Sequence, residues 1–205
     1  MRLYLIRHGE TEHNRKRLIQ GHAEVPLNDA GISQVARLAQ RMADLPVHEI
    51  LASDLRRTAM TASIVAAHTG APIIWEPRFR ERDPGELTDK TYEEAMAFFT
   101  DPDYHPPGGE SVPDFIRRVE SGFSDLIATR GTSDKHIAVV SHGMVCASFL
   151  RVCLGYSLEE VAEIRWPNAC LTIADYDGSW KLVTLGDASH VGAESGGDPA
   201  AITGA

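Results

Sequence analysis

The stretch that decides the fold stands at the start of the chain and reads Leu3-Tyr4-Leu5-Ile6-Arg7-His8-Gly9-Glu10-Thr11. Residues 3–7 form a short apolar run that is typical of a buried strand, and the polar, glycine-containing segment after them is typical of a loop. The same pattern returns at residues 49–52 and at residues 136–140, each followed by polar side chains. Three strands that each end in a polar cluster are therefore predicted.

Helical patterns alternate with these strands. Apolar periodicity, caps and glycine or proline stops predict helices over residues 28–43, 55–68, 112–129 and 143–154. Residues 73–75 add a short strand, and two strands at 171–176 and 180–185 are predicted to form a hairpin that turns at Asp177-Gly178. This alternation predicts an α/β fold, a three-layer sandwich with a mostly parallel sheet flanked by helices.

Two segments depart from the alternation. Residues 78–110 are rich in charge, proline and glycine, with one weak helical pattern at 92–99, so we interpret them as a small cap inserted over the functional face. Residues 189–205 are rich in Gly, Ala, Ser and Asp without apolar periodicity, which predicts a disordered tail. Residues 1–188 are expected to form a single catalytic domain.

The composition is ordinary for a soluble globular protein, with 43% hydrophobic and 24% charged residues among 205. A net charge of −9 disfavours a nucleic-acid or anionic-membrane partner, because both require a basic face. No apolar run approaches the roughly 20 residues that span a bilayer, and the N-terminal run is too short for a signal peptide. Cys146, Cys153 and Cys170 are expected to be reduced, buried apolar residues, which suggests a cytoplasmic protein.

The carboxyl ends of parallel strands meet at one edge of a sheet, where ligands bind in open α/β folds. Arg7 and His8 follow the first strand, Arg57 lies shortly after the second, and His142 follows the strand at residues 136–140. Two histidines and two arginines are therefore expected to converge on one crevice.

These residues favour an anion over a metal ion. A guanidinium presents a planar fork of donors that matches phosphate or carboxylate oxygens, Gly9 lets the backbone approach a ligand, and Gly143 begins a helix whose free N–H groups attract an anion. A zinc site would require a third histidine, cysteine or carboxylate, whereas arginines repel a cation. No metal and no cofactor are expected. Toward a bound phosphate, neutral imidazole can act as nucleophile while a buried carboxylic acid protonates the leaving group.

A series of short blocks runs along the chain from Met1 to about His190. The blocks are Arg7-His8-Gly9-Glu10-Thr11 with Asn14, Gln20-Gly21-His22, Pro26-Leu27-Asn28, Gly31, Ser53-Asp54-Leu55-Arg56-Arg57-Thr58, Thr61-Ala62, Glu81, Pro107-Gly108-Gly109-Glu110-Ser111, Ser141-His142-Gly143 and Pro167-Asn168-Ala169. In this order they resemble the motifs of the histidine phosphatase superfamily, also called the phosphoglycerate mutase-like family. The first block alone is moderately specific, and the ordered series is strongly specific.

The resemblance implies a role for each matching residue. It implies that His8 is the phosphorylated nucleophile and Glu81 the proton donor, and that Arg7, Arg57 and His142 complete the catalytic phosphate pocket. It further implies phosphate or substrate contacts from a second set: Asn14, Gln20, Gly21, Gly143 and Asn168.

Four acidic or hydroxyl residues near these motifs have other predicted roles. Asp83 is the rival to Glu81 as acid. Glu10 and Thr11 are expected to fix their loop rather than to catalyse. Asp54 is expected to cap the helix that begins at Leu55.

The resemblance implies a metal-independent phosphomonoester hydrolase acting on a small phosphorylated metabolite through a phosphohistidine intermediate. The alternative is a mutase, which returns the phosphoryl group to substrate and needs extra basic residues, whereas residues 88–109 contain only Lys90 and His105 as basic residues. A non-catalytic phosphate-binding domain on the same fold is a third possibility. The small phosphorylated substrate is the expected partner, and a homodimer is admissible.

Two departures from the family pattern affect the expected substrate rather than the mechanism. Leu87-Thr88-Asp89 stands where the phosphatase branch usually has Trp-Glu-Gly, and Leu18 occupies a position that is commonly basic. Both positions lie near the predicted cap and pocket rim.

Overall fold

Six strands form one sheet in the computed structural model, which describes residues 1–191. They are β1 (Arg2–Arg7), β2 (Glu49–Ala52), β3 (Ile73–Trp75), β4 (His136–Ser141), β5 (Leu171–Tyr176) and β6 (Trp180–Asp187). Their order is β3-β2-β4-β1-β5-β6. The first four pair in parallel, β5 is antiparallel to β1, and β6 is antiparallel to β5. The predicted mostly parallel sheet and the C-terminal hairpin are confirmed.

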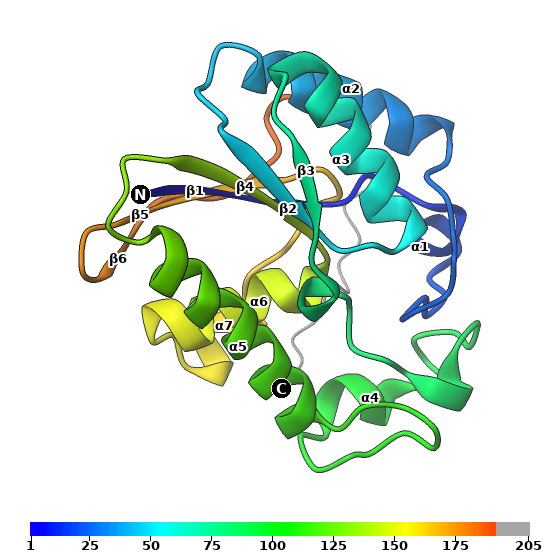
Figure 1. The fold of residues 1–205 in the computed structure, drawn as a ribbon. Coiled ribbons are helices and arrows are strands. Elements are labelled where there is room, and N and C mark those ends of the chain that lie inside the picture. Colours follow the sequence, from blue (N-terminus) through cyan, green and yellow to red (C-terminus); the bar gives the residue numbers. More distant parts are fainter. Residues whose placement is uncertain (192–205) are drawn as a thin grey trace.

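Helices cover both faces of this sheet (Figure 1). One face carries α2 (Asp29–Met42) and α3 (Arg56–Thr69), and the other carries α5 (Val112–Arg130), α6 (Gly143–Leu154) and α7 (Leu158–Ala162). The predicted three-layer sandwich is therefore confirmed.

Burial of β1 on both faces fixes the position of the residues that follow it. Successive side chains of a strand point to opposite faces. Leu3 and Leu5 accordingly pack in the apolar cluster formed with α5 and α6, and Tyr4 and Ile6 pack in the cluster formed with α2 and α3. Because β1 lies between β4 and β5, its carboxyl end delivers His8 to the interior of the molecule.

The predicted cap, residues 78–110, joins β3 to α5. It starts in the 3₁₀ turn Pro77–Phe79, continues through a second turn, Gly85–Leu87, and contains the helix α4 (Met96–Thr100). This helix begins later than the predicted 92–99. Residues 92–95 form turns instead, after reciprocal side-chain to backbone hydrogen bonds of 2.7 and 3.2 Å between Thr91 and Glu94 in the pattern of a capping box.

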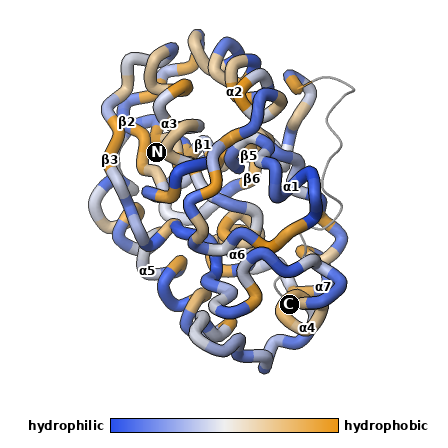
Figure 2. Tube along the Cα trace, turned by 90° about the vertical axis from the view of Figure 1, so that its right-hand side faces the viewer, coloured by the Kyte–Doolittle hydropathy of each residue, from blue (hydrophilic) through white to orange (hydrophobic). Residues whose placement is uncertain are grey.

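Two short helices, α1 (Glu12–Lys16) and α7, were not predicted. α1 has five polar residues and therefore no apolar stripe, and Figure 2 draws this segment as hydrophilic. A capping box between Thr11 and Asn14 holds it in place. α7 begins at a capping box between Ser157 and Glu160, a sequence signal that could have located it.

The expected capping of α3 by Asp54 is wrong. Leu55 is the N-cap residue, and it makes no side-chain capping bond. The Asp54 carboxylate instead accepts a hydrogen bond of 2.6 Å from Nε of Arg80 and lies in an ion pair with it. This pair ties the loop after β2 to the start of the cap.

The packed chain extends beyond the predicted domain boundary at Ser189. Nε2 of His190 donates to the carbonyl oxygen of Ala169 at 2.9 Å, and Val191 is buried in the cluster with α2 and α3. The rest of the predicted tail, residues 192–205, lies outside the described residues.

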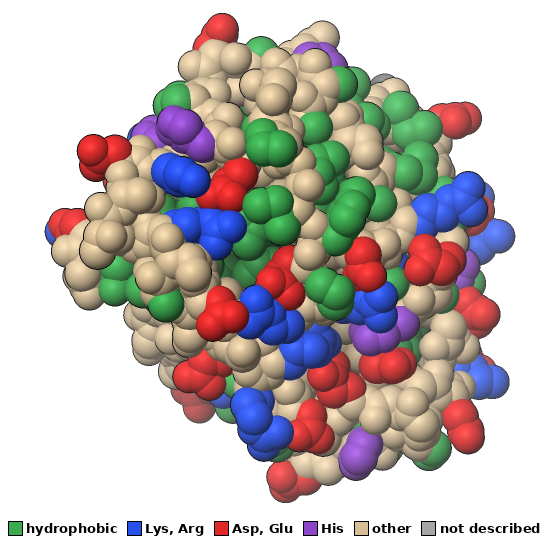
Figure 3. All heavy atoms as spheres, in the orientation of Figure 1, with side chains coloured by type: hydrophobic (Ala, Val, Ile, Leu, Met, Phe, Trp, Pro, Cys, Tyr) green, Lys and Arg blue, Asp and Glu red, His purple; other side chains and the backbone are tan. Residues whose placement is uncertain are grey.

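Charged side chains of both signs are interspersed on the face that Figure 3 shows. In the part of the chain that the structure describes, no helix has both the length and the apolar character required to cross a bilayer.

The three cysteines are free thiols. Cys146 and Cys170 are buried as expected, whereas Cys153 is half-buried.

Candidate active site

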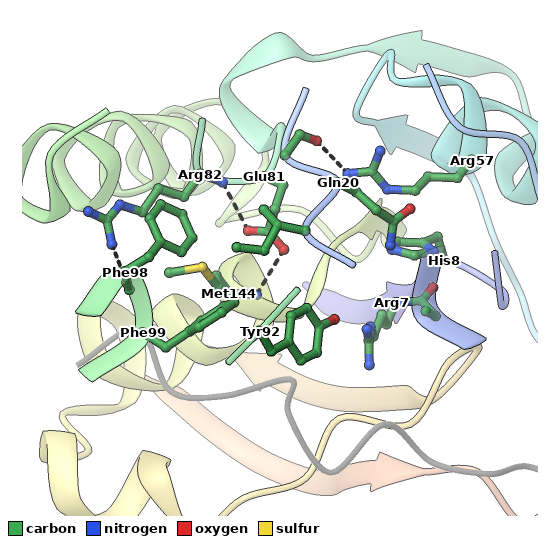
Figure 4. A pocket seen from close by; sticks show the side chains of 14 residues that line it. Arg7, His8, Gln20, Arg57, Glu81, Arg82, Tyr92, Phe98, Phe99 and Met144 are labelled. Carbon is green, nitrogen blue, oxygen red and sulfur yellow. Dashed lines mark hydrogen bonds between the residues drawn. The ribbon is translucent and has the colours of Figure 1, made fainter. Parts of the chain in front are cut away.

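A pocket with about 500 Å³ of empty space, counted to its solvent-facing mouth, lies between the sheet edge and the cap (Figure 4). Eight of the ten predicted site residues line it: Arg7, His8, Asn14, Gln20, Gly21, Arg57, Glu81 and Gly143. The other two, His142 and Asn168, contact pocket residues instead. The convergence expected from the strand ends is therefore observed.

The site residues lie at the carboxyl ends of strands or at the amino ends of helices. Arg7 ends β1 and His8 follows it, Arg57 stands in the first turn of α3, and His142 lies between β4 and α6. The rings of His8 and His142 meet edge to face with centroids 5.3 Å apart. Glu81 enters from the cap and lies across the pocket from His8 (Figure 4).

The tautomer of His8 follows from its hydrogen bond. Its Nδ1 lies 2.7 Å from the carbonyl oxygen of Gly9, which can only accept, so Nδ1 carries the proton. Burial, reinforced by the charges of Arg57 and Arg7, holds the pKa of His8 well below its usual range. The imidazole is therefore neutral near pH 7, with the lone pair on Nε2.

His142 is held neutral in the same way. Burial is the main cause that lowers its pKa well below the usual range, followed by the charge of Arg57. Nε2 lies 2.9 Å from Oγ of Ser53. Nδ1 is buried and has no hydrogen-bond partner within residues 1–191.

Arg57 is a fully buried cation. Its Nη2 and Nη1 donate to the carbonyl oxygens of Gly21 and Ala23 at 2.7 and 3.1 Å. Its Nε is buried without a hydrogen-bond partner among the described residues. Burial is the main cause that lowers the pKa of Arg57, to about 10, so the group stays charged near pH 7 and an anion beside it would offset part of the cost of burial. Arg7, also buried, donates to the carbonyl oxygen of Trp166.

These features fit an anion with several oxygen atoms. Two guanidinium groups and the neutral imidazole of His8 line one space, and the ring of His142 packs against that of His8. Within residues 1–191, no group of three or more His, Cys, Asp or Glu side chains is arranged to hold a metal ion. The site in the described residues therefore offers positive charge that suits a bound phosphate.

The surroundings of Glu81 favour the protonated, neutral form of its carboxyl group. Its Oε1 accepts from the amide of Arg82 at 3.0 Å, and its Oε2 accepts from the amide of Met144 at 3.2 Å. Burial raises its pKa and outweighs these two bonds and the arginine charges, which act in the opposite direction. A larger protonated fraction is therefore retained near neutral pH than for an exposed glutamate.

Arg118, which sequence reasoning missed, holds the segment that carries Glu81. Its Nη1 donates to the carbonyl oxygens of Arg78 and Arg80 at 2.8 and 2.9 Å, and its Nη2 donates to that of Glu81 at 3.2 Å. Nε and Nη2 also form a two-pronged ion pair with Glu110. In the sequence this arginine is one polar position of an amphipathic helix, so nothing marks it.

The remaining predicted residues fix the architecture of the site. Asn168 donates to the carbonyl oxygen of His8 and to Oδ1 of Asn14, both at 3.2 Å. Asn28 donates to Glu10 at 2.8 Å and Thr11 caps α1, which confirms both as loop-fixing residues.

Asp83, the rival acid, does not line the pocket. Its Oδ1 accepts from the amide of Gly85 at 2.9 Å, and its Oδ2 lies 3.5 Å from Nδ1 of His22.

Gly21 connects this site to the cap. Its φ is +46°, and a Cβ atom at this position would meet Cδ of Pro84 at 1.8 Å. A larger residue here would push the cap away from the loop that accepts the Arg57 hydrogen bond.

The chain belongs to the histidine phosphatase superfamily: the family model described as "Histidine phosphatase superfamily (branch 1)" matches residues 3–188. The chain is 33% identical over 206 residues to "Probable phosphoglycerate mutase GpmB" of Proteus mirabilis (strain HI4320), with 93% of this chain and 95% of that protein covered.

Two solved structures share the fold. "Bacillus stearothermophilus YhfR" matches with a TM-score of 0.84 and 27% identity, covering 93% of this chain and 99% of that chain. A putative alpha-ribazole-5'-P phosphatase from Escherichia coli str. K-12 substr. MG1655 matches with a TM-score of 0.82 and 29% identity, covering 92% and 97%. The superfamily contains both phosphatases and mutases, and the named relatives include both kinds.

Proposed function

We propose that the protein is a phosphomonoester hydrolase that passes the phosphoryl group of a small phosphorylated metabolite through His8 to water. The observation that carries this proposal is the neutral His8 tautomer beside the buried guanidinium of Arg57. It combines a nucleophile with a positive charge that would stabilise the phosphoryl oxygens.

In the first step, Nε2 of His8 attacks phosphorus and the bond from phosphorus to the ester oxygen breaks. Glu81 gives its proton to the leaving oxygen, so the alcohol departs uncharged. Arg7, Arg57 and His142 stabilise the oxygens of the phosphoryl group in flight. The amide of Met144, at the amino end of α6, stabilises the Glu81 carboxylate that remains.

In the second step, water attacks the phosphoryl group on His8. The Glu81 carboxylate takes the proton from this water, the bond from phosphorus to Nε2 breaks, and the imidazole returns to its neutral form. Inorganic phosphate leaves, and both His8 and Glu81 have regained their starting protonation states.

The mutase alternative shares the first step. It is favoured by the name of the Proteus mirabilis relative. Hydrolysis is favoured by residues 88–109 of the cap, because their basic residues Lys90 and His105 are not among the residues that line the pocket. His105 donates instead to the carbonyl oxygen of Gly109 at 3.1 Å. Arg82, the cap arginine that does line it, donates to three backbone carbonyl oxygens.

Hydrolase and mutase activity are distinguished by observing the phosphorus-containing products directly. The protein is incubated with 3-phosphoglycerate and a trace of 2,3-bisphosphoglycerate, and in parallel with a panel of phosphomonoesters, and the products are observed by ³¹P NMR. We expect inorganic phosphate from the panel and little 2-phosphoglycerate. Conversion to 2-phosphoglycerate faster than phosphate release from every ester would establish the mutase instead.

Turnover is expected to be independent of divalent metal. Arginines and neutral histidines surround the predicted phosphate position, so EDTA should change kcat by less than about twofold. Orthovanadate, which adopts the five-coordinate geometry of the transition state, should inhibit at micromolar concentration. Loss of activity in EDTA that zinc or magnesium restores would contradict the proposal.

Arg118 is expected to act as a positioning residue for Glu81. Arg118→Met removes the donors that hold the Glu81 segment, so kcat/KM for an alkyl phosphate should fall by about 10- to 10²-fold, the usual effect of a small misplacement. For 4-nitrophenyl phosphate, whose leaving group needs no acid, the loss should stay below about threefold.

The matched control is Arg117→Met, because Arg117 is exposed and pairs with Asp114 on the outer side of the same helix. It should leave both substrates unchanged. Equal losses on both substrates in Arg118→Met would show that Arg118 only stabilises the fold.

A further inference from the structure

The wall of the pocket that faces the phosphate cradle is apolar. Figure 4 shows Arg7, His8 and Arg57 grouped at one side, Phe98 and Phe99 at the other, and Tyr92 between the two groups. The apolar lining residues come from the loop after α1, the cap and the start of α6, and each is at most 8% exposed: Ile19, Tyr92, Phe98, Phe99 and Met144.

The aromatic rings form a continuous surface. The rings of Tyr92 and Phe99 meet nearly edge to face with centroids 5.2 Å apart, and those of Phe98 and Phe99 do the same at 5.2 Å. All three belong to the main apolar cluster, so their positions are fixed by packing rather than by a ligand. Such a preformed apolar surface favours a ligand that offers its own apolar area.

Among the lining residues in the described part of the chain, this side has no guanidinium or ammonium group left over for a second anionic group on a ligand. Arg82 is the third arginine of the lining, but it is 0% exposed and its three nitrogens donate to the carbonyl oxygens of Glu110, Phe98 and Tyr104 at 2.8–2.9 Å. Its guanidinium carbon also lies 4.1 Å from the centroid of the Phe98 ring. Arg82 therefore organises the cap.

Arg17 is the other basic residue at the aromatic wall. It is exposed, its guanidinium carbon lies 5.9 Å from the centroid of the Tyr92 ring, and it is not among the lining residues. Glu81 is the acidic residue of the lining, and it would repel a ligand carboxylate whenever it is ionised.

Resting on the hydrolase function above, we propose that the substrate is a phosphomonoester whose alcohol carries a flat apolar or aromatic body and no second anionic group. The phosphate occupies the cradle of Arg7, His8 and Arg57, and the body lies against Tyr92, Phe99 and their neighbours. A phosphate ester with a carboxylate would leave that charge desolvated and unpaired, which is costly.

The test is a series of esters with closely similar leaving groups. Benzyl phosphate and 4-carboxybenzyl phosphate differ by one anionic group, and 2-naphthylmethyl phosphate and propyl phosphate differ in apolar area. We expect kcat/KM for 4-carboxybenzyl phosphate to lie at least about 10²-fold below that of benzyl phosphate. We expect 2-naphthylmethyl phosphate to exceed propyl phosphate by about 10²-fold.

A matched pair of variants locates the preference in the wall. Phe99→Ala should lower the ratio of kcat/KM for 2-naphthylmethyl phosphate to that for propyl phosphate at least tenfold. The control is Met96→Ala, because Met96 lies on the same helix and is 48% exposed. It should change neither substrate.

The wild-type series decides the inference even if Phe99→Ala fails to fold. Equal or better turnover of 4-carboxybenzyl or propyl phosphate would overturn the substrate class while leaving the hydrolase function intact. No phosphate release from any ester, including 4-nitrophenyl phosphate, would overturn both.

Discussion

Replacing His8 with alanine is expected to lower kcat/KM for phosphate release by about 10⁴- to 10⁶-fold, as loss of a covalent nucleophile does in other enzymes. The arginines that bind phosphate remain, but no group can accept the phosphoryl transfer. The measurement is phosphate release from 4-nitrophenyl phosphate, because this ester needs no acid and isolates the nucleophile.

The matched control is His68→Ala, which makes the same change at an exposed position of α3. It should keep full activity. Because His8 is buried, its removal also leaves a cavity, so activity is measured well below the Tm of each variant. Activity within tenfold of wild type in a folded His8→Ala protein would contradict the role of His8.

Replacing Glu81 with glutamine is expected to slow alkyl phosphates by about 10²- to 10⁴-fold, the usual contribution of general acid catalysis. Glutamine keeps the shape, and its single carbonyl oxygen can still accept one of the two amides, that of Arg82 or that of Met144, but it has no acidic proton to give. Turnover of aryl phosphates should fall much less, because a phenolate leaves without protonation. The comparison is made on kcat/KM, since slow dephosphorylation of His8 could hide the effect on kcat.

Asp83→Asn is the control for this experiment. Asp83 bonds to the amide of Gly85 outside the pocket, so its replacement should affect alkyl and aryl esters alike and weakly. A leaving-group-selective loss in Asp83→Asn, with Glu81→Gln nearly normal, would transfer the acid role to Asp83.

The pH dependence of kcat/KM for an alkyl phosphate should show two limbs. Burial raises the pKa of Glu81, so the protonated acid persists to higher pH and activity falls only as pH rises through this raised pKa. Burial lowers the pKa of His8, so the neutral nucleophile persists to lower pH and activity falls only as pH drops through this lowered pKa. Glu81→Gln should remove the high-pH limb. Its persistence in that variant would assign the limb to another group.

Local pattern was enough to predict the elements that carry the chemistry. The apolar run of β1 and the polar cluster after it place His8 at a strand end, and parallel pairing brings Arg57 and His142 to the same edge. Strand alternation and helix caps are properties of neighbouring residues, which is why they can be predicted without coordinates.

The packing inside the cap could not be predicted in the same way. Arg82 lies in a charged, proline-containing stretch that suggests solvent exposure, yet it is fully buried because three distant carbonyl oxygens satisfy it. The sequence around Phe98 and Phe99 has no pattern that would indicate that these side chains line a ligand pocket. Their role depends on contacts between the cap and the sheet layers, which no local pattern encodes.

The central claim, a phosphoryl group carried on His8, is tested most directly by trapping it. The protein is mixed with ³²P-labelled benzyl phosphate for a fraction of one turnover, quenched in alkali, digested and mapped by mass spectrometry under conditions that avoid acid. We predict label on the peptide that contains His8, stable in alkali and lost in acid as a phosphohistidine is, with inorganic phosphate as its final product. Label on Ser53 or Cys170, or rapid turnover with no labelled protein at any time, would contradict the mechanism.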